Sequence, residues 1–85
     1  MPLYHFDIHY DGGVVIDAEG IDVIDIGAAE TLALEVLGQA ILDDARNRRT
    51  GLTKIEVRDE AGRIVASASA TVSLERLLRE RSEGE

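Results

Sequence analysis

One segment of the chain, residues 26–47, has the apolar periodicity of a long helix, and strand-like alternation occurs on both sides of it. Before this segment, residues 3–10 alternate apolar and polar side chains, and residues 14–18 follow after a turn. After it, residues 52–58 and 63–73 alternate in the same way. A parallel sheet needs strands and helices in alternation, so this order predicts an antiparallel sheet with one helix packed on one face.

The predicted fold is an α+β domain of four or five strands in the order β-β-(β)-α-β-β. The third strand, at residues 21–24, is optional. Asp25 is expected to cap the helix, because its carboxylate can accept hydrogen bonds from the free amides of the first turn. Residues 1–85 are expected to form a single domain. Helical composition at residues 74–81 predicts a short C-terminal helical tail within residues 74–85, whose last residues are expected to be disordered.

The first two strands are predicted to form a hairpin around a turn at residues 11–13. A three-residue loop pairs Ile8 with Ile16 and places both side chains on one apolar face. The same register places Asp7 opposite Asp17 on the polar face.

That polar face gathers four residues that suit a metal ion, namely His5, Asp7, Asp17 and Glu19. Facing carboxylates destabilise a sheet unless a cation lies between them, and histidine with carboxylates can hold a divalent metal. The alternative, which the pattern favours, is the solvated face of an antiparallel sheet. Neither a nucleophile elbow nor a glycine-rich phosphate loop is present, so the sequence predicts no enzyme activity and no cofactor.

The helix is too apolar for a sheet alone to cover. Leu34, Gly38 and Leu42 form a ridge outside the stripe that suits the sheet, so apolar positions span roughly 280° of the helix. A mid-helix glycine costs about 1 kcal/mol relative to alanine, which a close-packed neighbour would explain. Either the chain's own tail, through Leu74, Leu77 and Leu78, or a second protein chain is expected to cover this ridge. The stripe that suits the sheet comprises Ala29, Leu32, Ala33, Val36, Leu37, Ala40 and Ile41.

Charge limits the partners of the chain. The formal net charge is -8 at pH 7, and a nucleic acid repels a protein of that charge unless its cations are clustered. The cluster of Arg46, Arg48 and Arg49 is explained by the negative end of the helix dipole. There is no cysteine and no apolar segment long enough to span a bilayer. We expect no signal peptide, because the first residues lack a basic stretch followed by an apolar run. We therefore expect no nucleic-acid partner, no membrane association and a cytoplasmic location.

Several motifs taken together resemble a known family. They lie at residues 1–8 (MPLYHFDI), 11–15, 17–20 and 55–63. They resemble a family of short bacterial proteins that open with Met-Pro-x-Tyr-x-Phe-Asp and are described as a domain of unknown function. The resemblance extends over residues 1–74 and implies no catalytic residues. The layout is also similar, more loosely, to antitoxin domains of HicB type, which bind and block a small toxin protein.

The sequence thus predicts a non-catalytic protein-interaction or homodimerising module, whose partner is itself or another protein. The expected interface comprises Leu34, Gly38, Leu42, Leu77 and Leu78, together with the edge of the last predicted strand. Two alternatives remain open. One is an antitoxin-like binder of a small basic protein, and the other is a metal-binding protein or enzyme that uses the polar face of the first hairpin.

Overall fold

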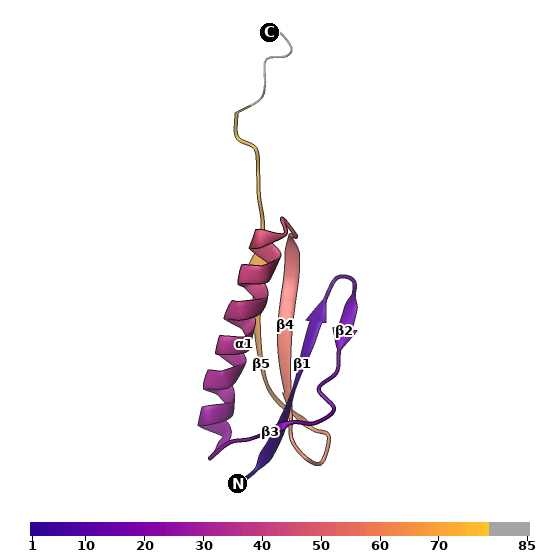
Figure 1. Ribbon diagram of the computed structural model, residues 1–85, viewed down its shortest axis with the longest axis vertical. Helices are drawn as coiled ribbons and strands as arrows, with labels where there is room; N and C mark the ends of the chain where they lie inside the picture. Colours follow the sequence, from indigo (N-terminus) through magenta and orange to yellow (C-terminus); the bar gives the residue numbers. More distant parts are fainter. Residues whose placement is uncertain (79–85) are drawn as a thin grey trace.

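The computed structural model describes residues 1–78 as a five-stranded antiparallel sheet with one helix on one of its faces (Figure 1). The elements in chain order are β1 (Leu3–Tyr10), β2 (Gly13–Val15), β3 (Ile21–Asp22), α1 (Ile26–Arg46), β4 (Gly51–Arg58) and β5 (Ile64–Val72). The predicted α+β class and element order are confirmed, including the optional third strand.

The sheet has the strand order β2-β1-β4-β5, and β3 pairs with the beginning of β1. β1 and β4 therefore lie at the centre, and β5 forms one edge. In the central pair, Phe6 lies opposite Val57 and Ile8 lies opposite Ile55. Polar pairs alternate with these apolar pairs, so one face of the sheet is apolar and the other is polar.

The core lies between the apolar face and α1. Ala29, Ala33 and Leu37 are buried, as the predicted sheet-facing stripe requires. Small side chains at this contact allow the helix to lie close to the strands. The buried apolar residues of the core are Phe6, Ala29, Ala33, Leu37, Ile55 and Val57.

Both ends of α1 are capped by hydrogen bonds. Asp25 Oδ1 accepts from the Ala28 amide at 2.9 Å, which confirms the predicted N-cap. The helix ends at Arg46, one residue earlier than predicted, and the side chain of Asn47 donates to the Asp43 carbonyl at 2.8 Å.

The predicted register of the first hairpin was wrong by one residue. Ile8 pairs with Val15 rather than with Ile16, because residues 11 and 12 form a two-residue loop. β2 also ends at Val15, whereas residues 14–18 were expected to form the strand. Residues 16–20 leave the ladder because Asp17 makes hydrogen bonds of a different kind, which are described below.

The predicted helical tail is also wrong for the residues that the structure describes. Residues 74–77 carry no helix, and residues 73–78 run away from the sheet and α1 (Figure 1). Leu77 and Leu78 are 85% and 84% exposed, so they do not cover the helix ridge. So short a helix is unstable in water unless an apolar surface supports it. The remainder of the expected tail, residues 79–85, lies outside the described residues.

Candidate functional site

The polar residues of the first hairpin gather around Arg58 of β4. Arg58 Nε donates to Asp7 Oδ2 at 2.6 Å, and Arg58 Nη2 donates to Asp7 Oδ1 at 3.1 Å. The same Nη2 donates to the backbone carbonyl of Asp17 at 3.1 Å. Asp7 is buried, and this bidentate pair neutralises its charge. The cation between the two aspartates is thus an arginine of the chain itself.

Asp17 fastens an irregular segment to the edge of β1. Its Oδ2 accepts from the Phe6 amide at 3.0 Å, and its Oδ1 accepts from the Gly20 and Glu19 amides at 3.0 and 3.2 Å. Its own amide donates to Asp7 Oδ1 at 2.9 Å. Phe6 lies between the parts of β1 that pair with β2 and with β3. The Asp17 carboxylate therefore accepts a hydrogen bond that a neighbouring strand would otherwise accept.

The pKa values of the cluster follow from these bonds. The pKa of Asp7 is lowered, chiefly because Arg58 donates to its carboxylate, and burial opposes this effect. Burial has the largest single effect on the pKa of Asp17 and would raise it. Backbone amides, that of Gly20 foremost, together outweigh burial and lower this pKa. The hydrogen bond to Asp7 raises the pKa of Arg58. Asp7, Asp17 and Arg58 are therefore all charged at neutral pH.

The four residues of the metal hypothesis come together only in part. His5 Nδ1 lies 2.9 Å from the Asp17 carbonyl, and Glu19 joins the cluster through its amide. Within residues 1–78, no three His, Cys, Asp or Glu side chains are grouped as a metal ion requires. The expected solvated face was also wrong at Asp7, which is buried. Sequence reasoning missed Arg58, although the demand for a cation between facing carboxylates was a usable signal.

A second row of charges continues along the same face of the sheet. Glu56 lies between Lys54, whose Nζ is 3.2 Å from its carboxylate, and His9, whose Nε2 is 2.8 Å from it. The His9 contact lacks hydrogen-bond geometry, so it is electrostatic and depends on protonation of the ring. This polar face thus carries an ion pair within β4, between Lys54 and Glu56, and contacts between charged groups of β4 and β1.

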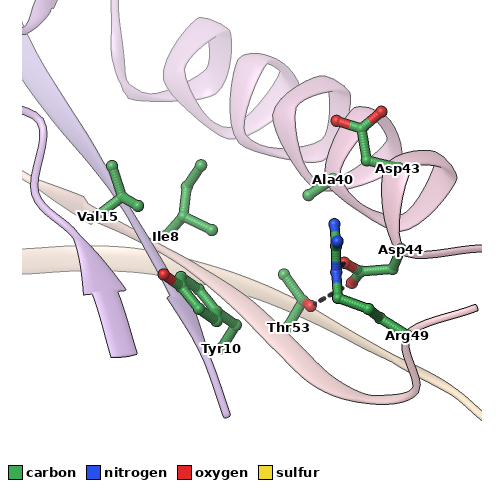
Figure 2. Close-up of a pocket in the computed structure, with 8 residues that line it drawn as sticks. All are labelled: Ile8, Tyr10, Val15, Ala40, Asp43, Asp44, Arg49 and Thr53. Carbon is green, nitrogen blue, oxygen red and sulfur yellow. Dashed lines mark hydrogen bonds and ion pairs between the residues drawn. The ribbon is translucent and has the colours of Figure 1, made fainter. Parts of the chain in front are cut away.

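A cavity of about 470 Å³ opens between the C-terminal half of α1 and the hairpin of β1 and β2 (Figure 2). It exists because α1 lies over β4 and β5 and leaves the apolar face of β1 and β2 less covered. Asp44, on its wall, accepts from Thr53 Oγ1 at 2.9 Å and from Arg49 Nε at 3.2 Å (Figure 2). No sequence pattern indicated this cavity. Its lining residues are Ile8, Tyr10, Val15, Ala40, Asp43, Asp44, Arg49 and Thr53.

The ridge of Leu34, Gly38 and Leu42 is exposed. Leu34 is 62% exposed and Leu42 is 42% exposed. A Cβ atom added at Gly38 would meet no side chain and no other element within 4 Å in the described part of the chain. The close-packed neighbour expected at Gly38 is therefore not supplied by residues 1–78.

Leu34 lies on the side of α1 that faces the free edge of β5. Gly38 and Leu42 lie on the side of α1 opposite the buried Ala29 and Ala33, so they face away from the sheet. A groove of about 290 Å³ separates α1 from β5, and Leu34 and Ser67 both line it. β5 is the last strand of the sheet, so its outer edge is unpaired within the described chain. No charged residue occurs in Ile64–Val72. Leu34, this groove and the outer edge of β5 form one surface, which we call the ridge–edge surface.

Comparison with known proteins gives the family but no described relative. Within residues 1–78, no helix is both long enough and apolar enough to cross a bilayer. Neither curated proteins nor solved structures match the chain. One family model matches residues 3–71. This range includes α1 and all five strands, apart from the last residue of β5. The chain therefore belongs to the family described as Domain of unknown function (DUF6894).

Proposed function

We propose that this protein is a non-catalytic interaction module that forms a homodimer through its ridge–edge surface. The outer edge of β5 is the main support. This strand has nine residues and contains neither charge nor proline. Natural proteins protect free edges with charged side chains, prolines, bulges or a covering element. An irregularity in the pairing lies near the start of β5, opposite Val57 and Arg58, and the strand beyond it is regular.

A second copy of the chain suits this surface better than a basic partner does. A basic protein is attracted by acidic side chains, and β5 has none. Two copies that each carry a net charge of -8 repel one another, so their contact has to lie where charges are sparse. The ridge–edge surface meets this condition, because alanine, serine, threonine and valine predominate along β5. Identical antiparallel edges can pair with each other about a two-fold axis.

The size of the chain also favours association. A domain of 85 residues buries a modest fraction of its surface, and small domains commonly gain stability from a partner chain. Pairing through β5 would cover Leu34 of both copies and satisfy backbone groups along the strand. Exposed apolar patches of this kind mark contacts in soluble proteins.

Sedimentation equilibrium of the purified full-length chain over a wide concentration range tests the proposal. We expect a reversible monomer–dimer equilibrium, with the dimer predominant at high concentration. A mass equal to one chain at every concentration would overturn the proposal.

A double substitution, Ser67→Lys with Ser69→Lys, tests whether β5 is the interface. Both serines are exposed, and the new cations would face one another across paired edges. We expect the dimer to be lost while the far-ultraviolet circular dichroism spectrum stays unchanged. The matched control, Gln39→Lys with Glu60→Gln, changes the net charge equally at exposed positions outside the ridge–edge surface and should remain dimeric. Equal dimerisation of both variants would place the interface elsewhere.

A further inference from the structure

We infer that a cavity beside the first hairpin binds an organic ammonium ion that carries an apolar group. The site combines the cavity of about 470 Å³ described above with a second one of about 290 Å³. The two adjoin and form one space, which we call the hairpin cavity, because they share four lining residues, namely Tyr10, Asp44, Arg49 and Thr53. The hairpin cavity lies on the β1 and β2 side of α1, whereas the proposed dimer interface lies at β5. The inference therefore does not depend on the homodimer.

Apolar side chains line one end of the hairpin cavity. Ile8 and Val15 lie opposite each other in the hairpin, and Ala40 of α1 faces them (Figure 2). Small-molecule sites in proteins have volumes of this size and walls that are largely apolar. An apolar group of a ligand would gain by entering this end, because both the ligand and the wall would then lose contact with water.

Tyr10 contributes an aromatic ring to both parts of the hairpin cavity. The ring lies over the hairpin loop, where a Cβ atom at Gly12 would be only 3.1 Å from Tyr10 Cε2. Glycine at residue 12 therefore leaves room for the ring in this position. The Tyr10 side chain is exposed to solvent, and the face of an aromatic ring attracts organic cations. Tyr10 can thus contact the apolar group and the ammonium group of one ligand.

The other end of the hairpin cavity is acidic. Three carboxylates, those of Asp11, Asp43 and Asp44, line the cavity. Arg49 supplies the one cation among the lining residues of the described chain, and it is paired with Asp44. Neither Asp11 nor Asp43 forms an ion pair within residues 1–78. Two negative charges are therefore left for a ligand to neutralise.

The backbone at the start of β4 leaves room for one of these carboxylates. A Cβ atom at Gly51 would be 2.5 Å from Asp11 Oδ2, so a residue with a side chain could not stand there without displacing Asp11. The carboxylate therefore lies against the backbone of Gly51, in the same part of the cavity as Tyr10 and Asp44. Glycines at residues 12 and 51 thus accommodate the aromatic ring and a carboxylate of one site.

These features favour an organic amine over a metal ion or an anion. Within residues 1–78, no three His, Cys, Asp or Glu side chains are grouped as a metal ion requires. An anion would meet the excess of carboxylates, and the net charge of -8 would repel it at longer range. An ammonium ion would be attracted by both, while its apolar group would lie against Ile8 and Val15. Tryptamine, which joins an indole ring to an ammonium group, is a suitable probe.

Titration of the isotope-labelled full chain with tryptamine, followed by two-dimensional NMR in low salt, tests the site. We expect saturable shifts of the amides of Ile8, Tyr10 and Ala40, with a dissociation constant of about 1 mM or lower. Indole-3-propionate, which carries a carboxylate in place of the ammonium group, should bind roughly tenfold more weakly. Equal or tighter binding of indole-3-propionate would overturn the ligand class. The absence of saturable shifts with tryptamine would overturn the site and leave the homodimer untouched.

A double substitution, Asp11→Asn with Asp43→Asn, tests the role of the unpaired carboxylates. It removes two negative charges from the cavity, and we expect tryptamine to bind roughly tenfold more weakly. The matched control, Glu35→Gln with Glu60→Gln, removes the same charge at exposed positions outside the hairpin cavity. The control should change the dissociation constant by less than about twofold, because solvent and salt screen distant charges. Equal weakening in both variants would mean that net charge alone attracts the amine, which contradicts the inferred site.

Substitution of Tyr10 tests the contribution of the aromatic ring. Tyr10→Leu keeps an apolar side chain but removes the ring, and we expect tryptamine to bind roughly threefold more weakly. Tyr10→Phe keeps the ring and should lose less affinity than Tyr10→Leu. An unchanged far-ultraviolet circular dichroism spectrum would show that both variants remain folded. Equal affinity of the two folded variants would contradict the inferred contact between the ring and the ammonium group.

Discussion

Arg58 is the residue that decides what the polar face of the first hairpin does. The sequence places Asp7 and Asp17 together and calls for a cation between them, but nine Lys and Arg residues could have supplied it. Arg58 does so because β4 pairs with β1, which sets Arg58 opposite His5. A partner 51 residues away along the chain is determined by the sheet order and not by local pattern. The result is a structural ion pair at the position where a metal site had been considered.

At this scale we predict that Asp7→Asn destabilises the protein and weakens its response to acid. The pKa of Asp7 is lower in the folded chain than in the unfolded chain. Its stabilising contribution is thus complete above the unfolded pKa of about 3.9 and is lost as the pH falls through the folded value. The variant should lose about 1–3 kcal/mol of unfolding free energy at neutral pH. Urea unfolding at neutral and acidic pH, at a fixed protein concentration, measures both effects.

Asp22→Asn is the matched control for this prediction. Asp22 is exposed on β3, so its substitution should change the unfolding free energy by less than about 0.5 kcal/mol. If Asp7→Asn keeps the full acid sensitivity of the wild type, the ion pair with Arg58 does not contribute to it.

Among the elements, the sequence predicted the packing of α1 better than the pairing of the first hairpin. The buried stripe of α1 was predictable, because helical periodicity alone determines which side chains share a face. The hairpin register was not, because two- and three-residue loops both suit the Asp-Gly-Gly turn. The two-residue loop pairs Ile8 with Val15 in place of Ile16, and Asp17 then binds the backbone of β1.

For the helix, we predict that Gly38→Ala raises the unfolding free energy by about 1 kcal/mol. The added methyl group meets open space in one chain. The monomeric background of Ser67→Lys with Ser69→Lys is suitable for the measurement, because it removes any contribution from association. Gly51→Ala should have the opposite effect, since Gly51 has a φ of 113° and a Cβ there would crowd Asp11. A loss of stability with Gly38→Ala in this background would show that Gly38 is needed within the single chain.

On the scale of the whole molecule, one helix covers only part of one sheet. α1 lies over β4 and β5, which leaves a cavity against β1 and β2 on one side and the ridge–edge surface on the other. The net charge of -8 opposes association everywhere except where charges are sparse.

We therefore predict that added salt strengthens dimerisation, by roughly tenfold between low and moderate ionic strength. Salt screens the repulsion between two acidic chains. Sedimentation equilibrium at several sodium chloride concentrations measures the change. Weaker dimerisation in salt would mean that charge pairs, and not uncharged contact, hold the copies together.

By itself, the sequence determined the element order, the N-cap at Asp25 and the apolar faces of helix and strands, because these depend on neighbours within a few residues. It also identified the Leu34–Gly38–Leu42 ridge as more apolar than a sheet can cover. Only the tertiary structure decided that Arg58 joins Asp7, that residues 73–78 do not cover the ridge, and that β5 is left at the edge of the sheet. These features depend on which distant strands pair and on where the helix lies over them, and short-range periodicity carries no information about either.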